Sequence, residues 1–413
     1  MNADNPPPGD RPMHICHVNM PIEYYSPVSG GAVATVIMNQ ARELTARGHD
    51  VSVLTITDGN PVYDIGRVIR IAAPQRHELS IPQRLVCKLK RAVLPWDYPY
   101  YGYYRASVVG ALARMRPRPD VVVVHNDLVS PIHMRRLMPD TRIVAHLHNE
   151  QRTRQPSLER AVAATSVFTC VSDHVRRWTI ARYGIASHQV ATVYNGIDLA
   201  AFRPPACEPD RAEGLNVLFI GRLNADKGPD LLADAVTQLN ASGCKINLTV
   251  AGSVWWYGHE RQHRDPYFRA LMPKIEAARA RYLGPVNRTN VPDLLRAQDV
   301  VVVPSRWSEP FGLVLLEAMA CGRAVITTRR GGIPEVCGDA AAYFDPDHPG
   351  SLPDALRAFA QAGAALSAAK HASRARADAF TWAASVDQFE AAVSSVRPPR
   401  GFRPGLAASG SHS

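Results

Sequence analysis

Long apolar runs, paired cysteines and lysine are all scarce in this sequence of 413 residues. No run of about 18 or more apolar residues is present, so a transmembrane helix is not expected. Met1–Arg11 is polar and proline-rich and lacks the apolar core of a signal peptide. The seven cysteines never have the two-residue spacing of zinc sites, which argues against a structural metal or a disulfide framework and favours the reducing cytoplasm.

Motifs that would define other classes of protein are also missing. The chain has no Gly-x-Gly-x-x-Gly after a strand and no Gly-x-x-x-x-Gly-Lys-Ser/Thr, which argues against a dinucleotide-dependent dehydrogenase and a P-loop enzyme. The net charge of +10 is not accompanied by any nucleic-acid recognition motif, and we expect no nucleic-acid partner. Anionic substrates, an acidic membrane surface or simply an arginine-rich proteome would account for the charge.

What the sequence does contain is an alternation of short β-branched runs with longer amphipathic stretches. In the first half, the predicted strands are 13–18, 50–57, 120–125, 142–147, 167–171 and 190–194, and the helices are 33–47 and 104–115. In the second half, the predicted strands are 215–220, 246–251, 300–303 and 324–327, and the helices are 229–240, 291–297 and 313–320. Strands that are apolar throughout, such as Val121–Val124, indicate parallel sheets covered on both faces.

This pattern predicts an α/β fold with two doubly wound, Rossmann-like domains that face each other across a cleft. A pause in the alternation near residues 200–212 separates the two domains. We expect domains at 13–205 and 206–378, with disordered segments at 1–12 and 397–413. Ligands of such folds bind beyond the carboxyl ends of the strands.

The loop Gly221–Asp230 follows an apolar strand and leads into a helix. It places Arg222 and Lys227 at the carboxyl end of the strand, and Pro229 suits the first turn of the helix. Two cations beside a helix N-terminus form a suitable site for a diphosphate. Taken alone, the same loop would also suit a polar turn with two solvated cations.

A second loop joins the strand near residue 300 to a helix and carries Glu309 and Glu317. Eight helical residues span about 12 Å, so the two carboxylates can contact opposite ends of one extended ligand. The backbone N–H groups that would face a phosphate between them are those of Phe311, Gly312 and Leu313. A nucleotide sugar has this layout of sugar hydroxyls, diphosphate and ribose. An isolated pair would instead be a capping and an ordinary helical glutamate, but the flanking Pro-Phe-Gly and the apolar strand favour the ligand.

Together these motifs resemble the retaining glycosyltransferases of family four, which have the GT-B fold. The resemblance rests on Gly-x-x-x-x-Lys-Gly after a strand and on Glu-x7-Glu within Ser…Glu-Pro-Phe-Gly-Leu-Val…Glu-Ala-Met-Ala-Cys-Gly. It covers about residues 13–395 and includes Gly331–Glu335, Tyr194–Asp198 and Val171–Asp173. It implies an acceptor-binding N-terminal domain, a C-terminal domain that binds the nucleotide sugar, and a helix at 379–396 that packs back on the N-terminal domain.

The resemblance also implies roles for individual residues. Arg222 and Lys227 would neutralise the donor diphosphate. Glu309 would hold the hydroxyl groups of the donor sugar, and Glu317 would hold the ribose. His148 aligns with the active-site histidine of the family and would touch the donor sugar, whereas a lone histidine at a strand end is usually structural.

Three further features bear on this site. The glycine pair Gly30-Gly31 would lie against the donor phosphates, where glycine lets the backbone approach closely, although it suits a plain turn before a helix equally well. His125 and His146 are expected to be structural or to face the acceptor. The sequence departs from the commonest pattern by having three residues, Arg306–Ser308, between Ser305 and Glu309 instead of two, which would alter the neighbouring loop.

The implied reaction is transfer of a hexose from a nucleoside-diphosphate sugar, with UDP favoured, to a hydroxyl or amine of a sugar, lipid-linked or natural-product acceptor. No metal or other cofactor is expected, because Arg222, Lys227 and the helix termini supply positive charge. Asp345-Pro-Asp347-His348 resembles a metal-binding triplet but is interpreted as a turn. The alternatives are a non-catalytic glycan-binding or coat protein of the same fold and a sugar-nucleotide epimerase.

The segment Arg84–Tyr104 places basic residues beside tryptophan and tyrosine. This combination suits peripheral contact with an acidic membrane. It suits equally an aromatic acceptor pocket, or a solvated basic helix beside a packed aromatic loop. We therefore expect a cytoplasmic protein, either free or bound at the inner face of the membrane.

Overall fold

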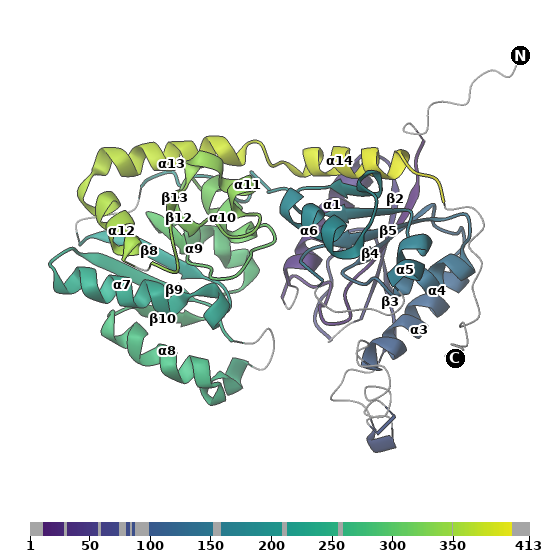
Figure 1. Ribbon diagram of the computed structural model, residues 1–413, viewed down its shortest axis with the longest axis horizontal. Helices are drawn as coiled ribbons and strands as arrows, with labels where there is room; N and C mark the ends of the chain where they lie inside the picture. Colours follow the sequence, from purple (N-terminus) through teal and green to yellow (C-terminus); the bar gives the residue numbers. More distant parts are fainter. Residues whose placement is uncertain are drawn as a thin grey trace, which may run out of the picture.

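The computed structural model describes residues 11–28, 31–56, 59–73, 80–82, 85–86, 99–151, 158–208, 213–254, 259–348 and 350–398. The chain forms two domains, and each is built on one parallel sheet with helices on both of its faces (Figure 1). The predicted fold class, two Rossmann-like α/β domains, is confirmed. Among the described residues, no helix is both long and apolar enough to cross a bilayer.

The N-terminal sheet has seven strands in the order β3-β2-β1-β4-β5-β6-β7. The strands are β1 (His14–Val18), β2 (Asp50–Thr55), β3 (Arg67–Arg70), β4 (Val121–His125), β5 (Arg142–Leu147), β6 (Val167–Cys170) and β7 (Val190–Thr192). The helices are α1 (Ala32–Ala46), α3 (Pro99–Arg114), α4 (Ser130–Leu137), α5 (Leu158–Ala164), α6 (Asp173–Tyr183) and the 3-10 turn η1 (Ser187–Gln189). Strand β4 is buried along its whole length because it lies at the centre of the sheet, which explains its run of valines.

The C-terminal sheet has six strands in the order β10-β9-β8-β11-β12-β13. The strands are β8 (Leu215–Ile220), β9 (Ile246–Ala251), β10 (Arg281–Gly284), β11 (Val300–Val303), β12 (Ala324–Thr328) and β13 (Ala342–Phe344). The α-helices are α7 (Pro229–Ala241), α8 (Pro266–Ala277), α9 (Val291–Arg296), α10 (Leu313–Ala320), α11 (Ile333–Cys337), α12 (Ser351–Gln361), α13 (Gly363–Ala377) and α14 (Trp382–Ser394). The 3-10 turns are η2 (Ala225–Lys227), η3 (His259–Arg264), η4 (Arg288–Asn290) and η5 (Gly338–Ala340).

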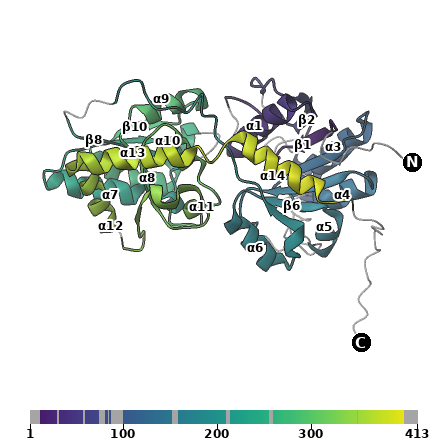
Figure 2. The same cartoon turned by 90° about the horizontal axis from the view of Figure 1, so that it is seen from above.

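The chain crosses back to the N-terminal domain after α13, so that α13 lies over one domain and α14 over the other (Figure 2). Helix α14 packs against α1. The guanidinium of Arg47 donates hydrogen bonds of 2.7 Å to both Asp387 and Glu390 of α14. His49 lies 2.8 Å from the other oxygen of Glu390. These contacts hold α14 against the N-terminal domain.

A close backbone contact joins the domain linker to the start of α14. A Cβ atom at Gly196 would lie 2.5 Å from the backbone nitrogen of Trp382, so only glycine fits there without a shift of the backbone. The N–H of Ile197 donates to the carbonyl of Phe380 at 2.9 Å. The N–H of Tyr194 donates to Gln388 of α14 at 2.8 Å. The motif Tyr194–Asp198 therefore connects the end of the N-terminal domain to α14 and to the residues just before it.

Three strands at or near the sheet edges, β3, β10 and β13, were not predicted. Strand β3 has the sequence Arg-Val-Ile-Arg with both arginines exposed, and therefore lacks a continuous apolar run. The other two are short and only partly buried. Element ends also differ from the prediction: α3 begins at Pro99 instead of 104, and β2 ends at Thr55 instead of 57.

Candidate active site

A cavity of about 260 Å³ lies between the two domains, at the carboxyl ends of their strands. The N-terminal domain contributes the first turns of α1 and residues that follow β5 and β6. The C-terminal domain contributes residues that follow β8 and β11 and the first turn of α10. The predicted site residues on its wall are His148, Arg222, Lys227, Glu309, Phe311, Gly312 and Leu313. The fold thus brings together residues that are far apart in the sequence.

The loop after β8 is shaped by hydrogen bonds and by one glycine. The side chain of Asn224 accepts a 3.2 Å hydrogen bond from the backbone N–H of Lys227 and so caps η2. Gly228 has a φ of +66°, and a Cβ atom there would lie 2.2 Å from the carbonyl oxygen of Pro304. Glycine after the lysine therefore allows this loop to pack on the end of β11. As a result, Arg222 and Lys227 face the cavity.

Lys227 and Glu309 form an ion pair at the cavity wall. Glu309 is only 5% exposed, and it also accepts a 2.6 Å hydrogen bond from the hydroxyl of Ser305. A buried carboxylate needs such partners, because removing its charge from water is costly. The two motifs that were recognised separately in the sequence are therefore parts of one charged group.

The additional residue between Ser305 and Glu309 links this group to α7. The guanidinium of Arg306 donates two hydrogen bonds of 2.7 Å to the carboxylate of Asp230, and its backbone N–H donates to Asp226 at 2.8 Å. The ring of Trp307 lies 5.3 Å from the ammonium nitrogen of Lys227. The residues between Ser305 and Glu309 thus hold the loop Gly221–Asp230, called the lysine loop, through two hydrogen bonds from Arg306. They also place the ring of Trp307 beside Lys227.

The N-terminus of α10 opens toward the cavity. Gly312 precedes the helix with a φ of +92°, and no side-chain cap covers this terminus among the described residues. Phe311, Gly312 and Leu313 all line the cavity. The N–H of Leu315 donates to the carbonyl of Gly312 at 3.0 Å. The N–H groups that precede it at the helix start, together with the helix dipole, favour an anion at this position.

Glu317 lies about one turn after Leu313 on α10 and does not line the cavity. Its side chain is 1% exposed and forms an ion pair with Arg288 of η4. Its second oxygen, Oε2, has no hydrogen-bond partner among the described residues. Arg288 was not predicted from the sequence, because it comes from a loop without a recognisable motif.

Gly31 precedes α1, whereas Gly30 lies outside the described residues. The carboxylate of Glu23 accepts hydrogen bonds from the backbone N–H groups of Val33 at 3.1 Å and Ala34 at 3.2 Å. Burial raises the pKa of Glu23, although these two hydrogen bonds oppose the shift. A Cβ atom at Gly31 would lie 2.5 Å from the Glu23 carboxyl carbon. The N-terminus of α1 is thus occupied by a carboxylate that no sequence motif predicted.

His148 belongs to a cluster of histidines behind the cavity wall. Its Nε2 lies 2.8 Å from Nδ1 of His125, whose Nε2 lies 3.1 Å from Nδ1 of His17. Nδ1 of His146 lies 2.7 Å from the hydroxyl of Thr169. Burial lowers the pKa of all four imidazoles, to about 4 for His17 and about 3 for His146, so they are neutral near pH 7.

The two domains are also joined by a carboxylate outside the cavity. Glu335 of α11 accepts hydrogen bonds of 2.6 Å from the backbone N–H groups of Asp173 and His174, which begin α6 in the other domain. The hydroxyl of Tyr194 donates to the same carboxylate at 3.1 Å. The recognised motifs around residues 171–173, 194–198 and 331–335 meet at this contact.

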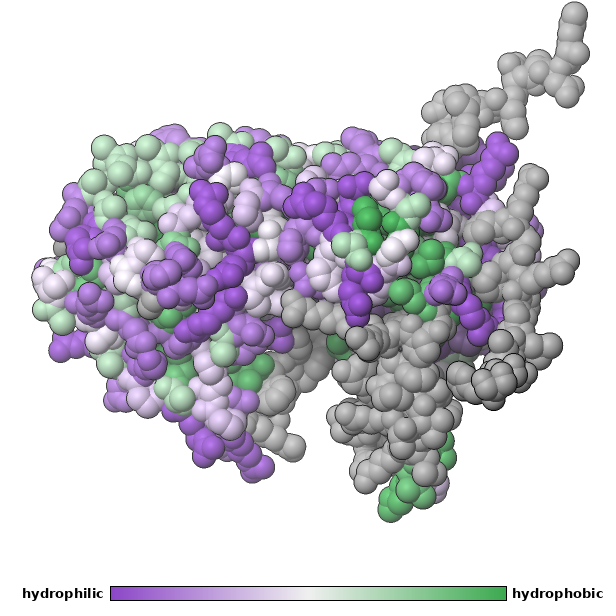
Figure 3. Space-filling model, in the orientation of Figure 1, coloured by the Kyte–Doolittle hydropathy of each residue, from purple (hydrophilic) through white to green (hydrophobic). Residues whose placement is uncertain are grey.

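Two other predicted features lie away from the cavity. Asp345 and His348 form an exposed 2.9 Å contact within a turn, as interpreted from the sequence. Most of the basic and aromatic segment 84–98 lies outside the described residues. Leu85, which is described, is 58% exposed, and Ile81, just before the segment, is 83% exposed. Figure 3 shows a small group of hydrophobic residues at the lower end of the molecule.

Two family models match the chain. The model described as Glycosyltransferase Family 4 matches residues 29–201, and the model described as Glycosyl transferases group 1 matches residues 209–376. One match therefore covers most of each domain.

Individual relatives agree with these matches. Spore coat protein SA of Bacillus subtilis is 27% identical over 327 residues, which are 75% of this chain and 79% of that protein. A D-inositol 3-phosphate glycosyltransferase of Mycolicibacterium paratuberculosis is 29% identical over 387 residues, which are 86% of this chain and 84% of that protein. The structure of Anabaena HepE in complex with UDP and glucose superimposes with a TM-score of 0.69 at 21% identity, over 93% of this chain and 100% of that one.

Proposed function

Because the chain belongs to the group 1 and family 4 glycosyltransferases and has their GT-B architecture, we propose that its donor is a nucleoside-diphosphate sugar. The sugar moves to a hydroxyl or amine of a glycan, glycolipid or natural-product acceptor. The observation that carries this proposal is the cavity between the domains, where Lys227, Arg222 and the α10 N-terminus meet Glu309 and His148.

The donor diphosphate binds between Arg222, Lys227 and the first turn of α10. Two cations and uncapped backbone N–H groups on one side of a small cavity provide the charge that a diphosphate requires. Since this charge is already in place, transfer proceeds without a metal ion. The contact between Lys227 and Glu309 keeps both side chains ordered before the donor arrives.

The donor sugar lies between Glu309 and His148, which line the cavity from opposite domains. Glu309 is a carboxylate acceptor for sugar hydroxyls, held in position by the hydroxyl of Ser305. His148 is neutral at working pH because burial lowers its pKa, so its ring can accept or donate a hydrogen bond to the sugar without adding a charge.

Glu317 binds the ribose hydroxyls. Its Oε2 is buried and has no hydrogen-bond partner among the described residues, which supports this role because a buried carboxylate oxygen without a donor is unfavourable. Arg288 holds the other oxygen in an ion pair. Because Glu317 is buried and does not line the cavity, binding of the ribose requires Arg288 to move aside.

In the reaction, the bond between the anomeric carbon and the diphosphate oxygen breaks, and its electrons remain on the nucleoside diphosphate. The acceptor oxygen or nitrogen then forms its bond to the same face of the sugar, so the anomeric configuration is retained. The proton of the acceptor passes to a diphosphate oxygen. Arg222, Lys227 and the α10 N-terminus lower the barrier by stabilising the charge on the departing diphosphate.

UDP is the proposed nucleotide, supported by the structurally similar Anabaena HepE, which was solved with UDP-glucose. A thermal-shift screen with UDP-, GDP-, ADP- and TDP-sugars tests this choice, and product analysis with and without acceptor tests transfer. We expect a UDP-sugar to stabilise the protein most and a glycoside to form only with acceptor. Donor conversion into an isomeric sugar nucleotide without acceptor would instead identify an epimerase.

A non-catalytic role is the second candidate, because one relative is named as a spore coat protein. The gathering of Arg222, Lys227 and Glu309 in one cavity favours catalysis, since a binding protein has no need to neutralise a leaving diphosphate.

Peripheral contact with acidic lipids is proposed for the exposed residues Ile81 and Leu85. Co-sedimentation with acidic vesicles at low salt tests this contact, and absence of binding would contradict it.

A further inference from the structure

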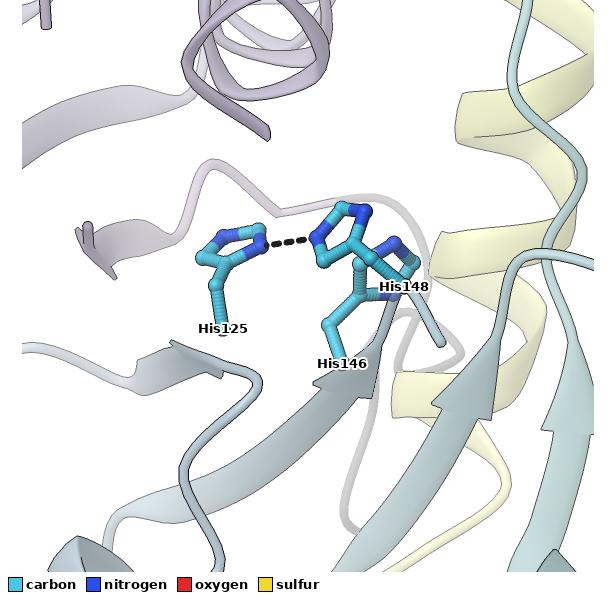
Figure 4. A group of neighbouring side chains, drawn as sticks. All are labelled: His125, His146 and His148. Carbon is cyan, nitrogen blue, oxygen red and sulfur yellow. Dashed lines mark hydrogen bonds between the residues drawn. The ribbon is translucent and has the colours of Figure 1, made fainter. Parts of the chain in front are cut away.

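Three histidine rings converge at the carboxyl ends of two neighbouring strands. His125 ends β4, His146 lies near the end of β5, and His148 follows it directly. Their ring centroids are 4.5 to 5.3 Å apart, and one ring nitrogen of each lies within 4.8 Å of the others (Figure 4). This is the one group of histidine, cysteine or acidic side chains with such spacing in the part of the chain that the structure describes.

The surroundings of His146 define which nitrogen is available. Its Nδ1 lies 2.7 Å from the hydroxyl of Thr169. When Nδ1–H donates to this hydroxyl, Nε2 carries the lone pair. Nε2 is buried and has no hydrogen-bond partner among the described residues. A buried imidazole nitrogen without a donor is unfavourable unless something else binds it.

The contacts of His125 and His148 also allow each ring to present a nitrogen lone pair. Nε2 of His125 faces Nδ1 of His17 at 3.1 Å, to which it can donate its proton. The lone pair then lies on Nδ1, which faces Nε2 of His148 at 2.8 Å. With the lone pair on Nδ1 of His125, this contact is a hydrogen bond from Nε2–H of His148. When His148 carries its proton on Nδ1 instead, the lone pairs on Nδ1 of His125 and on Nε2 of His146 and His148 can point to one position.

We propose that His125, His146 and His148 bind one divalent transition-metal cation, for which Zn²⁺ is the best match. Three neutral imidazoles suit Zn²⁺ and its neighbours Co²⁺ and Ni²⁺, whereas Mg²⁺ and Ca²⁺ prefer oxygen ligands. Zinc–nitrogen bonds of about 2.0–2.1 Å place tetrahedral ligand atoms about 3.4 Å apart. The nitrogens of His125 and His148, now 2.8 Å apart, would separate by about half an ångström.

Two of the three histidines already have a hydrogen-bond partner on the ring nitrogen that would not bind the metal. With the metal bound, Thr169 would accept a hydrogen bond from Nδ1–H of His146, and Nδ1 of His17 would accept one from Nε2–H of His125. Such contacts fix the ring orientation and the tautomer of metal-binding histidines. His148 lines the cavity, so a bound cation would hold that ring against the cavity wall.

The test uses the full chain after treatment with a chelator. Zn²⁺ binding is measured by titration calorimetry, and Co²⁺ is added separately as a spectroscopic probe. We expect one equivalent of Zn²⁺ to bind and Co²⁺ to give the absorption of a four-coordinate site. His146→Asn keeps a polar group near Thr169 but removes Nε2, and it should weaken Zn²⁺ binding at least about a hundredfold. Because the readout is bound metal, it does not depend on the proposed sugar transfer.

The matched control is His348→Ala, which removes the exposed contact with Asp345 and should leave the stoichiometry at one. Thr169→Val keeps every histidine and removes only the orienting hydroxyl, so Zn²⁺ binding should weaken by about 10- to 100-fold. Equal Zn²⁺ affinity of the unmodified chain and His146→Asn would overturn the proposal, as would absence of Co²⁺ uptake. If His146→Asn does not fold, unchanged affinity in Thr169→Val would overturn it.

Discussion

At the scale of single residues, the ammonium group of Lys227 connects the features of the candidate site. It pairs with the carboxylate of Glu309, lies beside the ring of Trp307 and faces the cavity. A lysine held in this way is a fixed point charge, ready to stabilise a leaving diphosphate without reorganisation. Glu309 in turn depends on Lys227 and Ser305 for its partners.

Replacing either member of this pair should strongly reduce turnover. We expect Lys227→Ala and Glu309→Ala each to lower kcat at least about a hundredfold, because one removes charge at the diphosphate and the other a hydroxyl acceptor at the sugar. Steady-state kinetics with the donor identified by screening, together with circular dichroism, measures both activity and fold. Lys274→Ala removes an exposed lysine paired with Asp234 and serves as the control. Near-normal transfer by either cavity variant would contradict the site.

The histidine cluster predicts a dependence of stability on pH. Burial lowers the pKa of His146 to about 3, whereas an unfolded histidine titrates near 6.5. Between these values the unfolded chain binds more protons, so the free energy of unfolding falls as the pH decreases below about 6.5. His146 alone contributes a loss of about 2 kcal/mol between about pH 6.5 and pH 5.

Urea denaturation of the chelator-treated chain at a series of pH values measures this effect. His146→Asn should show a shallower decline in the free energy of unfolding below about pH 6.5, whatever its stability near neutrality. His371→Asn, at an exposed position on α13, should keep the slope of the unmodified chain. Parallel declines for His146→Asn and the unmodified chain would show that this imidazole is not buried in its neutral form.

At the scale of secondary-structure elements, the sequence predicted those strands in which every residue is buried. Central strands such as β4 and β11 consist almost entirely of valine, because both faces of a central parallel strand are covered. Strand β3 begins and ends with exposed arginine, so its sequence does not differ from that of a loop. Its pairing with β2 is a property of the folded sheet, not of those residues alone.

The same distinction applies to the site. Lys227 and Glu309 were predicted from motifs, since each lies in a loop with characteristic neighbours. Arg288 beside Glu317 and Glu23 beneath α1 were missed, because each reaches its partner only through the tertiary fold. The three-residue spacing Arg306–Ser308 was noted as an irregularity, and the structure shows that Arg306 within it contacts Asp230.

The clamp between Arg306 and Asp230 predicts an effect on catalysis through loop position. Arg306→Ala should lower kcat about tenfold with a smaller change in donor KM, because the lysine loop would lose its bidentate anchor. Arg306→Lys should restore only part of kcat, since lysine cannot form both hydrogen bonds. Arg357→Ala removes a more exposed pair with Asp354 and should have no effect. Equal kcat for Arg306→Ala and the unmodified chain would contradict a positioning role.

At the scale of the whole molecule, the candidate site exists only when the two domains meet. The cavity takes its walls from both domains, and a continuous apolar core that includes Val171, Phe311 and Ile333 runs across their boundary. Glu335 adds a polar contact by accepting from the N–H groups that begin α6. Helix α14, which follows the C-terminal domain in the sequence, packs on the N-terminal domain and so connects the two a second time (Figure 2).

Removing the Glu335 carboxylate should weaken this closed arrangement. Glu335→Ala leaves the N–H groups of Asp173 and His174 without their acceptor, which should cost about 1–3 kcal/mol of unfolding free energy. Donor KM should rise because the cavity walls are held together less firmly. Chemical denaturation and donor titration measure the two effects, and Glu276→Ala on the exposed side of α8 is the control. Unchanged stability and KM would contradict the role of this contact.

The central claim, that the cavity between the domains transfers a sugar from a nucleoside-diphosphate donor, is tested most directly by the stoichiometry of products. In one reaction with donor and acceptor, free nucleoside diphosphate and glycoside are quantified together for the unmodified chain and Lys227→Ala. We predict equal amounts of both products from the unmodified chain and at least about a hundredfold less of both from Lys227→Ala. Equal glycoside formation by the two proteins, or no product from any of the four donors, would contradict the account.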